Sequence, residues 1–168
     1  MPSPALTPGR VLLILVGLET SIGPYAADWS ASHVLNPRWP PHARFHNGQT
    51  MSLGMCLGLL TVYFAWKPVL GTRSNATAKP IQGKGRKDEQ ADDSGSGMTE
   101  KESITMSAVM GTLYWISGLS AILYPGTLWV DPEFGTGAPQ APIFVISIVL
   151  AWLGWAVEMR RLGKVKGA

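Results

Sequence analysis

Four apolar stretches recur along the chain, separated by polar segments that contain most of the prolines and charges. They cover residues 11–27, 51–66, 104–124 and 143–157. A helix needs about 20 predominantly apolar residues to cross the hydrocarbon core of a bilayer. The third stretch reaches that length without a charged residue. The pattern therefore predicts an all-α protein, a bundle of four transmembrane helices.

Prolines mark the expected starts of two of these helices. Proline fits the first turn of a helix because the backbone N–H that it lacks would have no partner there. Pro40-Pro41 predicts that the second helix begins well before its apolar part. Pro142 lengthens the fourth helix, which we expect to place Glu158 and Met159 at the membrane interface.

The first stretch is less clear because Glu19 lies inside it and Pro24 lies near its end. Its alternative is a cleaved signal peptide. No small-x-small cleavage site stands at its end, however, because Pro24 and Tyr25 precede Ala26 and Ala27. We therefore expect this stretch to remain as a transmembrane helix.

Basic residues lie almost entirely on one side of the predicted bundle. Arg38 and Arg44 are the only ones of the 14 Lys and Arg residues in the first and third connections. Because basic loops stay in the cytoplasm, we expect both termini to be cytoplasmic and these two connections to be exoplasmic or lumenal. The net charge of +3 is then a topology signal, and nucleic acid is excluded as a partner.

This topology divides the chain into three parts. Residues 1–70 hold the first two helices and a polar exoplasmic loop at 28–41, and residues 104–168 hold the last two helices and a basic tail. Residues 71–103 are rich in Gly, Ser, Lys and Asp, so we expect a disordered cytoplasmic loop. Within the second helix, Gly54 and Gly58 permit close helix approach, and Cys56 is expected in the core.

Candidate chemistry is concentrated between residues 19 and 49, which contain all three histidines. Polar and ionisable groups at a membrane are costly unless they pair or face a cavity, so they are functional candidates. His42 and His46 are four residues apart, on one face of the second helix, and Gln49 continues that face. The pair could bind a metal, act in acid–base chemistry without one, or meet lipid headgroups.

Two acids accompany these histidines. A metal on the pair would need a third ligand from His33, Asp28 or Glu19. Glu19 lies near half depth in the first helix, where a neutral carboxylic acid beside an imidazole forms an acid–base pair. Its alternative is a hydrogen bond with Ser or Thr on a neighbouring helix. Asp28 lies either in the same site or at a helix end.

The segment from Asn36 to Pro41 is conformationally stiff because each residue before a proline is kept out of the helical region. A stiff loop can cap a membrane cavity, with Trp39 as the cover and Arg38 or Arg44 bound to an oxygen of the ligand. The alternative is an interfacial anchor that binds no ligand.

Residues 33–46, HVLNPRWPPHARFH, resemble a block in a group of small fungal four-helix integral membrane proteins. Some relatives of that group accompany secondary-metabolite pathways. The overall plan is also similar to that of sterol-isomerase-like and anthrone-oxygenase-like membrane proteins. The resemblance implies membership of a group, and the reaction remains an analogy.

Together these features predict an enzyme of the endoplasmic reticulum membrane, active in secondary metabolism. We expect it to isomerise or cyclise a lipophilic metabolite by acid–base chemistry, without metal or cofactor, with membrane lipids as its other partners. The expected catalytic residues are Glu19, His46 and His42. The expected substrate-binding residues are Arg44, Arg38, Trp39, Gln49, Asp28 and His33.

Two alternatives remain open at this level. One is a membrane protein without catalytic activity that binds a lipid or a partner through the exoplasmic loop. The other is a metal-dependent oxygenase.

Overall fold

A computed structural model describes residues 6–77 and 98–165, with side chains for 6–67 and 98–164. This part of the chain forms four α-helices and one 3₁₀ helix and contains no strand. The helices are α1 (Pro8–Asp28), α2 (Pro41–Thr77), α3 (Glu100–Ser120), η1 (Ala121–Leu123) and α4 (Ala141–Val165).

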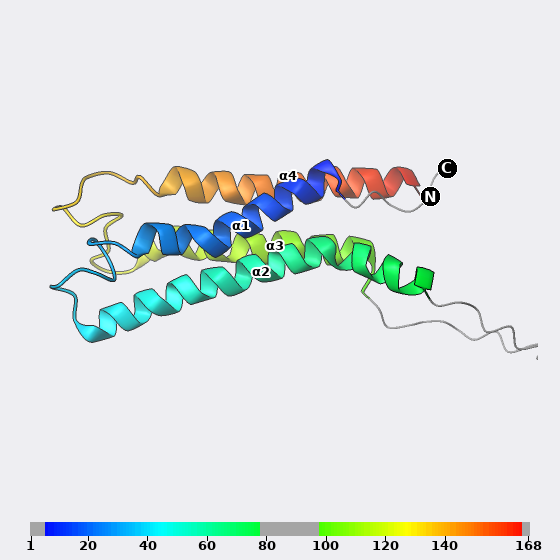
Figure 1. Ribbon diagram of the computed structural model, residues 1–168. Helices are drawn as coiled ribbons and strands as arrows, with labels where there is room; N and C mark the ends of the chain where they lie inside the picture. The colour runs from blue at the N-terminus through cyan, green and yellow to red at the C-terminus, as the bar shows by residue number, and fades with distance from the viewer. Residues whose placement is uncertain (1–5, 78–97, 166–168) are drawn as a thin grey trace, which may run out of the picture.

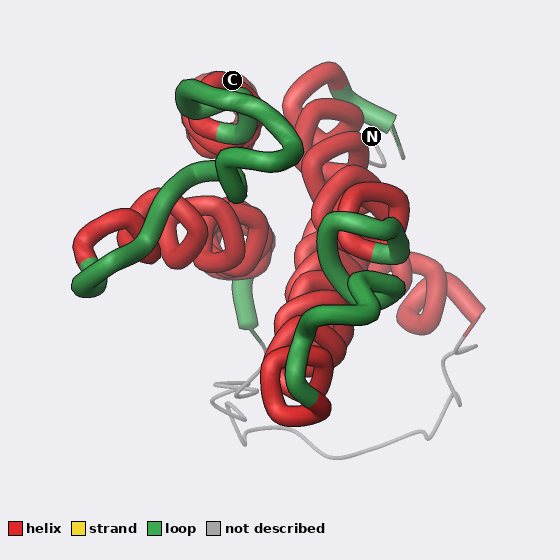
Figure 2. Tube along the Cα trace, turned by 90° about the vertical axis from the view of Figure 1, so that its left-hand side faces the viewer, coloured by secondary structure: helices red, strands yellow, loops and turns green. Residues whose placement is uncertain are grey.

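The helices form an up-and-down bundle in which each helix packs against its neighbours in sequence and α4 returns to α1. α1 also contacts α3 across the bundle. The connections 29–40 and 124–140 lie at one end, and both chain termini lie at the other (Figure 1). Figure 2 views the bundle from the end that carries these two connections.

Each α-helix is long and apolar enough to cross a membrane, so the predicted all-α architecture with four candidate spans is confirmed. The outer surface is apolar, as a lipid-facing surface must be. Leu18, Ile22, Leu59 and Val149 are among the exposed large side chains. The interior instead contains many small and polar residues, which is typical of helix packing in lipid.

The predicted proline starts are confirmed, since α2 begins at Pro41 and α4 at Ala141, one residue before Pro142. The expected loop at 71–103 is shorter at both edges, because residues 71–77 and 100–103 are helical. At the second edge, Thr99 and Glu102 form a capping box that starts α3. Residues 78–97 of that loop lie outside the described residues.

Hydrogen bonds from small side chains join the helices inside the bundle. Ser107 Oγ donates to the Thr61 carbonyl at 2.7 Å, and Ser103 Oγ donates to the Phe64 carbonyl at 2.8 Å. Such bonds between transmembrane helices contribute about 0.6 kcal/mol each on average. Several together fix how α3 is rotated against α2.

Glycines set the distance between α1 and α2, as the sequence predicted for Gly54 and Gly58. A Cβ atom at Gly58 would overlap the Gly17 carbonyl and the Ser21 side chain, and one at Gly54 would lie 2.8 Å from Pro24. Both helices therefore approach to backbone contact along this line.

The prediction that Cys56 lies in the core was wrong, because the residue is exposed. Gly54 and Gly58 mark the face of α2 that meets α1. Cys56 lies two residues after Gly54, about 200° around the helix axis, so it points away from the bundle.

Glu158, expected near the membrane interface, lies in a buried polar cluster close to the end of α4. Its side chain is fully buried, and it accepts hydrogen bonds from the Thr7 hydroxyl and from Arg161 Nε at 2.8 Å. Glu100 Oε1 in turn binds Arg161 Nη2 at 2.6 Å and Arg10 Nη2 at 2.5 Å. We call these five residues the terminal ion cluster; it joins α1, α3 and α4.

Close packing of α1 on α4 explains why Glu158 is enclosed. A Cβ atom at Gly9 would lie 2.5 Å from the Gly154 carbonyl and 2.7 Å from Glu158 Cγ. Since neither glycine carries a side chain, the start of α1 covers Glu158. A buried carboxylate is tolerated there because hydroxyl and guanidinium donors surround it.

We expect Glu158→Ala to destabilise the protein by about 3–5 kcal/mol, because it removes the fully buried carboxylate that holds Thr7 and Arg161 together and breaks a buried ion pair. The matched control is Glu133→Ala, which removes the exposed ion pair with Arg38 and should cost about 0–1 kcal/mol. Reversible unfolding in mixed micelles measures both. Equal losses for the two variants would contradict a stabilising role of the terminal ion cluster.

Gly58→Ala should separate α1 from α2 and cost about 1–3 kcal/mol, since the added methyl group cannot be accommodated without backbone movement. Gly48→Ala is the control on the same helix, because nothing lies within 4 Å of a Cβ atom there. The same unfolding measurement should show no loss for this control. A harmless Gly58→Ala would show that the α1–α2 crossing is not as close as described.

Candidate functional site

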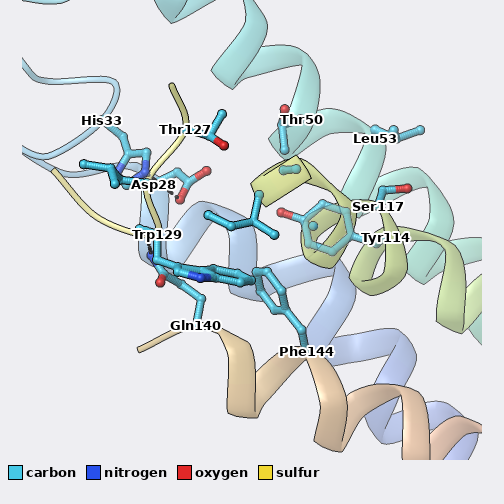
Figure 3. Close-up of a pocket in the computed structure, with 14 residues that line it drawn as sticks. Asp28, His33, Thr50, Leu53, Tyr114, Ser117, Thr127, Trp129, Gln140 and Phe144 are labelled. Atoms are coloured by element: carbon cyan, nitrogen blue, oxygen red, sulfur yellow. Dashed lines mark hydrogen bonds and ion pairs between the residues drawn. The ribbon is translucent and has the colours of Figure 1, made fainter. Parts of the chain in front are cut away.

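A pocket of about 430 Å³ opens at the end of the bundle opposite the termini. Its wall comes from all four α-helices, η1 and both connections at that end (Figure 3). The lining residues are Asp28, His33, Thr50, Leu53, Tyr114, Ser117, Gly118, Ala121, Ile122, Thr127, Leu128, Trp129, Gln140 and Phe144. The volume is within the range of about 300–1,000 Å³ that is usual for small-molecule sites.

Aromatic rings make up much of the wall. The Phe144 and Trp129 ring centroids are 6.4 Å apart. Phe144 also lies directly against α3, where a Cβ atom at Gly118 would be 2.7 Å from the ring. Glycine at this position therefore makes room for the ring and keeps the first turn of α4 close to the last turn of α3.

An acid and an imidazole stand together in this wall (Figure 3). His33 Nε2 lies 3.7 Å from Asp28 Oδ1, and His33 Nδ1 lies 2.8 Å from Ser32 Oγ. Asn47 Nδ2 donates to Asp28 Oδ2 at 2.8 Å, which holds the carboxylate at the end of α1. Both oxygens of Asp28 thus have defined neighbours.

Gln140 adds a side-chain amide to the pocket wall. Its Nε2 donates to the Trp129 carbonyl at 2.8 Å, which fixes the orientation of the amide. Its Oε1 is buried and has no hydrogen-bond partner among the residues with described side chains. A buried acceptor without a donor costs about 1–3 kcal/mol.

Two of the predicted site residues, Asp28 and His33, line this pocket, and Glu19 does not. Ser147 Oγ donates to Glu19 Oε2 at 2.9 Å, so the alternative of a hydrogen bond to a neighbouring helix is the one observed. Gly17 and Ser21 lie against Gly58, which places Glu19 at that level of α2.

The expected convergence of Glu19 with the histidines was therefore wrong. His46 lies twelve residues from Gly58 along α2, a separation of about 18 Å along the helix axis. A side chain cannot span that distance. The error has a simple cause, because the sequence gives no axial register between the two helices.

His42 and His46 form a separate exposed pair on the first turns of α2, with 3.0 Å between their Nε2 atoms. Gln49 Oε1 lies 3.2 Å from His46 Nδ1. The third metal ligand considered for this pair is not provided by Glu19, Asp28 or His33. Within the described residues, no group of three His, Cys, Asp or Glu side chains is arranged to hold a metal.

The residues expected to cover the pocket instead hold the first connection together. Arg44 Nη2 donates to the Asn36 carbonyl at 2.7 Å, and Arg38 pairs with Glu133 of the other connection. The Trp39 ring packs edge-on against His33 at 5.4 Å. None of these three side chains lines the pocket, but together they fix the segment that carries His33.

A model of a family whose function is unknown, DUF6640, matches residues 13–89 and 89–167 of the chain. The chain belongs to this family. The match spans every helix that lines the pocket. No curated protein and no solved structure matches the chain.

In this DUF6640 protein, the sequence interpretation missed the α3 and α4 side of the pocket. Tyr114, Ser117 and Gly118 lie three and four residues apart in α3, so they share one face of that helix, and Ala121 follows in η1. That spacing was the available signal. It could not be distinguished from ordinary helix packing, because the partner on α4, Phe144, becomes apparent only in the folded bundle.

Proposed function

We propose that the protein is an integral membrane enzyme that isomerises or cyclises a lipophilic small molecule by acid–base chemistry. One observation carries this proposal: a carboxylate and an imidazole, Asp28 and His33, line the same largely apolar pocket. The location at the end of a bundle of apolar helices gives a lipophilic molecule a route from the bilayer.

The chemistry requires one group that takes a proton and one that returns it. The separation of 3.7 Å between Asp28 and His33 allows one substrate region to face both groups. Asp28 as the base and His33 as the acid would remove a proton at one substrate atom and deliver one at another. The substrate gains and loses one proton, so its composition is unchanged, as isomerisation and cyclisation require.

In this proposal the catalytic roles expected for Glu19, His42 and His46 pass to Asp28 and His33. Glu19 is engaged with Ser147, and the exposed histidine pair is not part of the pocket wall. The proposal still uses one carboxylate and one imidazole, as the sequence hypothesis did, but at different residues.

The wall also limits the substrate. Among the described residues that line it there is no Lys or Arg, and its polar groups include the Asp28 carboxylate. A lipophilic molecule with a hydroxyl or amine donor complements this carboxylate. Membership of secondary metabolism is part of the proposal and is supported by the resemblance of residues 33–46; location in the endoplasmic reticulum is also part of the proposal.

The proposal also includes the side of the membrane to which the pocket opens. The start of α1 and the end of α4 lie at one end of the bundle (Figure 1), and at the opposite end the two connections and the first turn of α2 hold only Arg38 and Arg44 of the 14 Lys and Arg residues. Since basic segments remain cytoplasmic, the pocket would open to the exoplasmic or lumenal side.

Asp28→Asn should reduce turnover by about 100-fold or more, the usual contribution of a general acid or base, while the membrane level of the protein is unchanged. Asp131→Asn is the control, an exposed acid in the connection at the same end that does not line the pocket. Metabolite profiles of cells with deleted, native and variant genes identify the accumulating substrate and measure its conversion. Full conversion by Asp28→Asn would overturn the assignment.

A comparison of Ser117→Phe with Ser120→Phe distinguishes an enzyme from a protein that only binds a small molecule. Both residues are exposed serines on α3, but only Ser117 lines the pocket. If the pocket binds a lipophilic molecule, mass spectrometry of solvent extracts of the purified protein should find it with the native protein and with the second variant, and not with the first. Loss of bound molecule with an unchanged metabolite profile would indicate a binding protein and would contradict the enzymatic proposal.

Thiol labelling tests the orientation of the bundle in the membrane. Single cysteines are introduced into the Cys56→Ser variant, which has no other cysteine. Met98→Cys precedes α3 at the terminus end, and Phe134→Cys lies in the connection at the pocket end; both positions are exposed. In sealed microsomes, a membrane-impermeant maleimide should label the first at once and the second only after permeabilisation. The reverse order would overturn the cytoplasmic placement of the termini.

A further inference from the structure

We propose that His42 and His46 form a chelating site for a divalent late transition-metal ion, with Cu²⁺ as the best fit. The site is independent of the pocket and of the reaction proposed there. It lies on the first turns of α2, before the apolar part of the helix begins at Met51, so water reaches it. Both side chains are exposed.

The separation of the two nitrogens matches what a metal needs. Imidazole nitrogens lie about 2.0–2.1 Å from a bound metal. Two such ligands at a right angle, as in the tetragonal geometry of Cu²⁺, are then about 3.0 Å apart. His42 Nε2 and His46 Nε2 are 3.0 Å apart, so the pair reaches chelating separation without moving the helix backbone.

Neighbouring side chains orient the imidazole rings of His42 and His46 for metal binding. Gln49 Oε1 lies 3.2 Å from His46 Nδ1, so Nδ1–H donates to it and the Nε2 lone pair faces His42. A hydrogen bond of this kind on the second ring nitrogen is the usual support of a metal-ligating histidine. Phe45 stacks on His42, with ring centroids 6.0 Å apart and planes 3° apart.

The electrostatic surroundings do not oppose a cation. Arg44, the basic residue between the two histidines in sequence, directs its guanidinium to the Asn36 carbonyl. The site supplies two nitrogen ligands, and water completes the coordination. Among divalent first-row ions, Cu²⁺ binds such nitrogen ligands most strongly.

The test is Cu²⁺ titration of the purified full-length protein in detergent, followed by calorimetry and electron paramagnetic resonance. One ion should bind per chain with the hyperfine pattern of two imidazole nitrogens. His42→Ala and His46→Ala should each abolish this signal, and Gln49→Leu should weaken binding by about 10-fold, the lower end of the usual effect of removing a hydrogen bond to a metal-ligating histidine.

His33→Ala is the matched control, because it removes the third histidine of the chain and should leave the Cu²⁺ signal intact. Thermal unfolding of His42→Ala should match the native protein, since the side chain is exposed. Unchanged binding in the His42→Ala, His46→Ala double variant, or loss of binding in His33→Ala, would overturn the proposal. Neither result bears on the turnover measured for Asp28→Asn.

Discussion

The bundle depends on one constraint: the polar groups that α1 carries into the membrane must find partners within the protein, because hydrocarbon offers none, and three of them find partners on other helices. Arg10 binds Glu100 of α3, Glu19 accepts a hydrogen bond from α4, and Thr20 Oγ1 accepts one from Trp115 of α3 at 3.0 Å. Arg10 lies near the start of α1, and Glu19 and Thr20 lie near its middle. Together they fix the rotation and the axial position of α1, and glycines along α1, α2 and α4 then allow backbone contact.

The two ends of the bundle follow from this arrangement and differ in character. At the terminus end, the terminal ion cluster ties three helices together and leaves Glu158 fully buried. At the other end, the connections spread the helices, and a pocket with an acid, an imidazole and aromatic rings opens between them. A rigid base beneath an open site is a suitable arrangement for holding catalytic groups in place, since a misplaced group loses rate steeply.

Part of the site was predictable from residue types alone. A dense group of titratable residues beside a membrane helix indicated functional chemistry, and Asp28 and His33 from that group do line the pocket. Glu19, Arg38 and Arg44 belong to the same segment but bind other partners. These partners are Ser147 for Glu19, Glu133 for Arg38 and the Asn36 carbonyl for Arg44. Their partners could not be identified because no local pattern records which distant residue occupies the same depth.

The sequence by itself determined the number of helices, the proline starts at Pro41 and Pro142, and the end of the bundle that carries the polar chemistry. These properties depend on local composition and on the length that a bilayer requires. Only the tertiary structure decided that Glu158 is buried, that Gly118 faces Phe144 and that Glu19 stands apart from the histidines. Such relations depend on helix rotation and axial register, which are set by contacts between residues far apart along the chain.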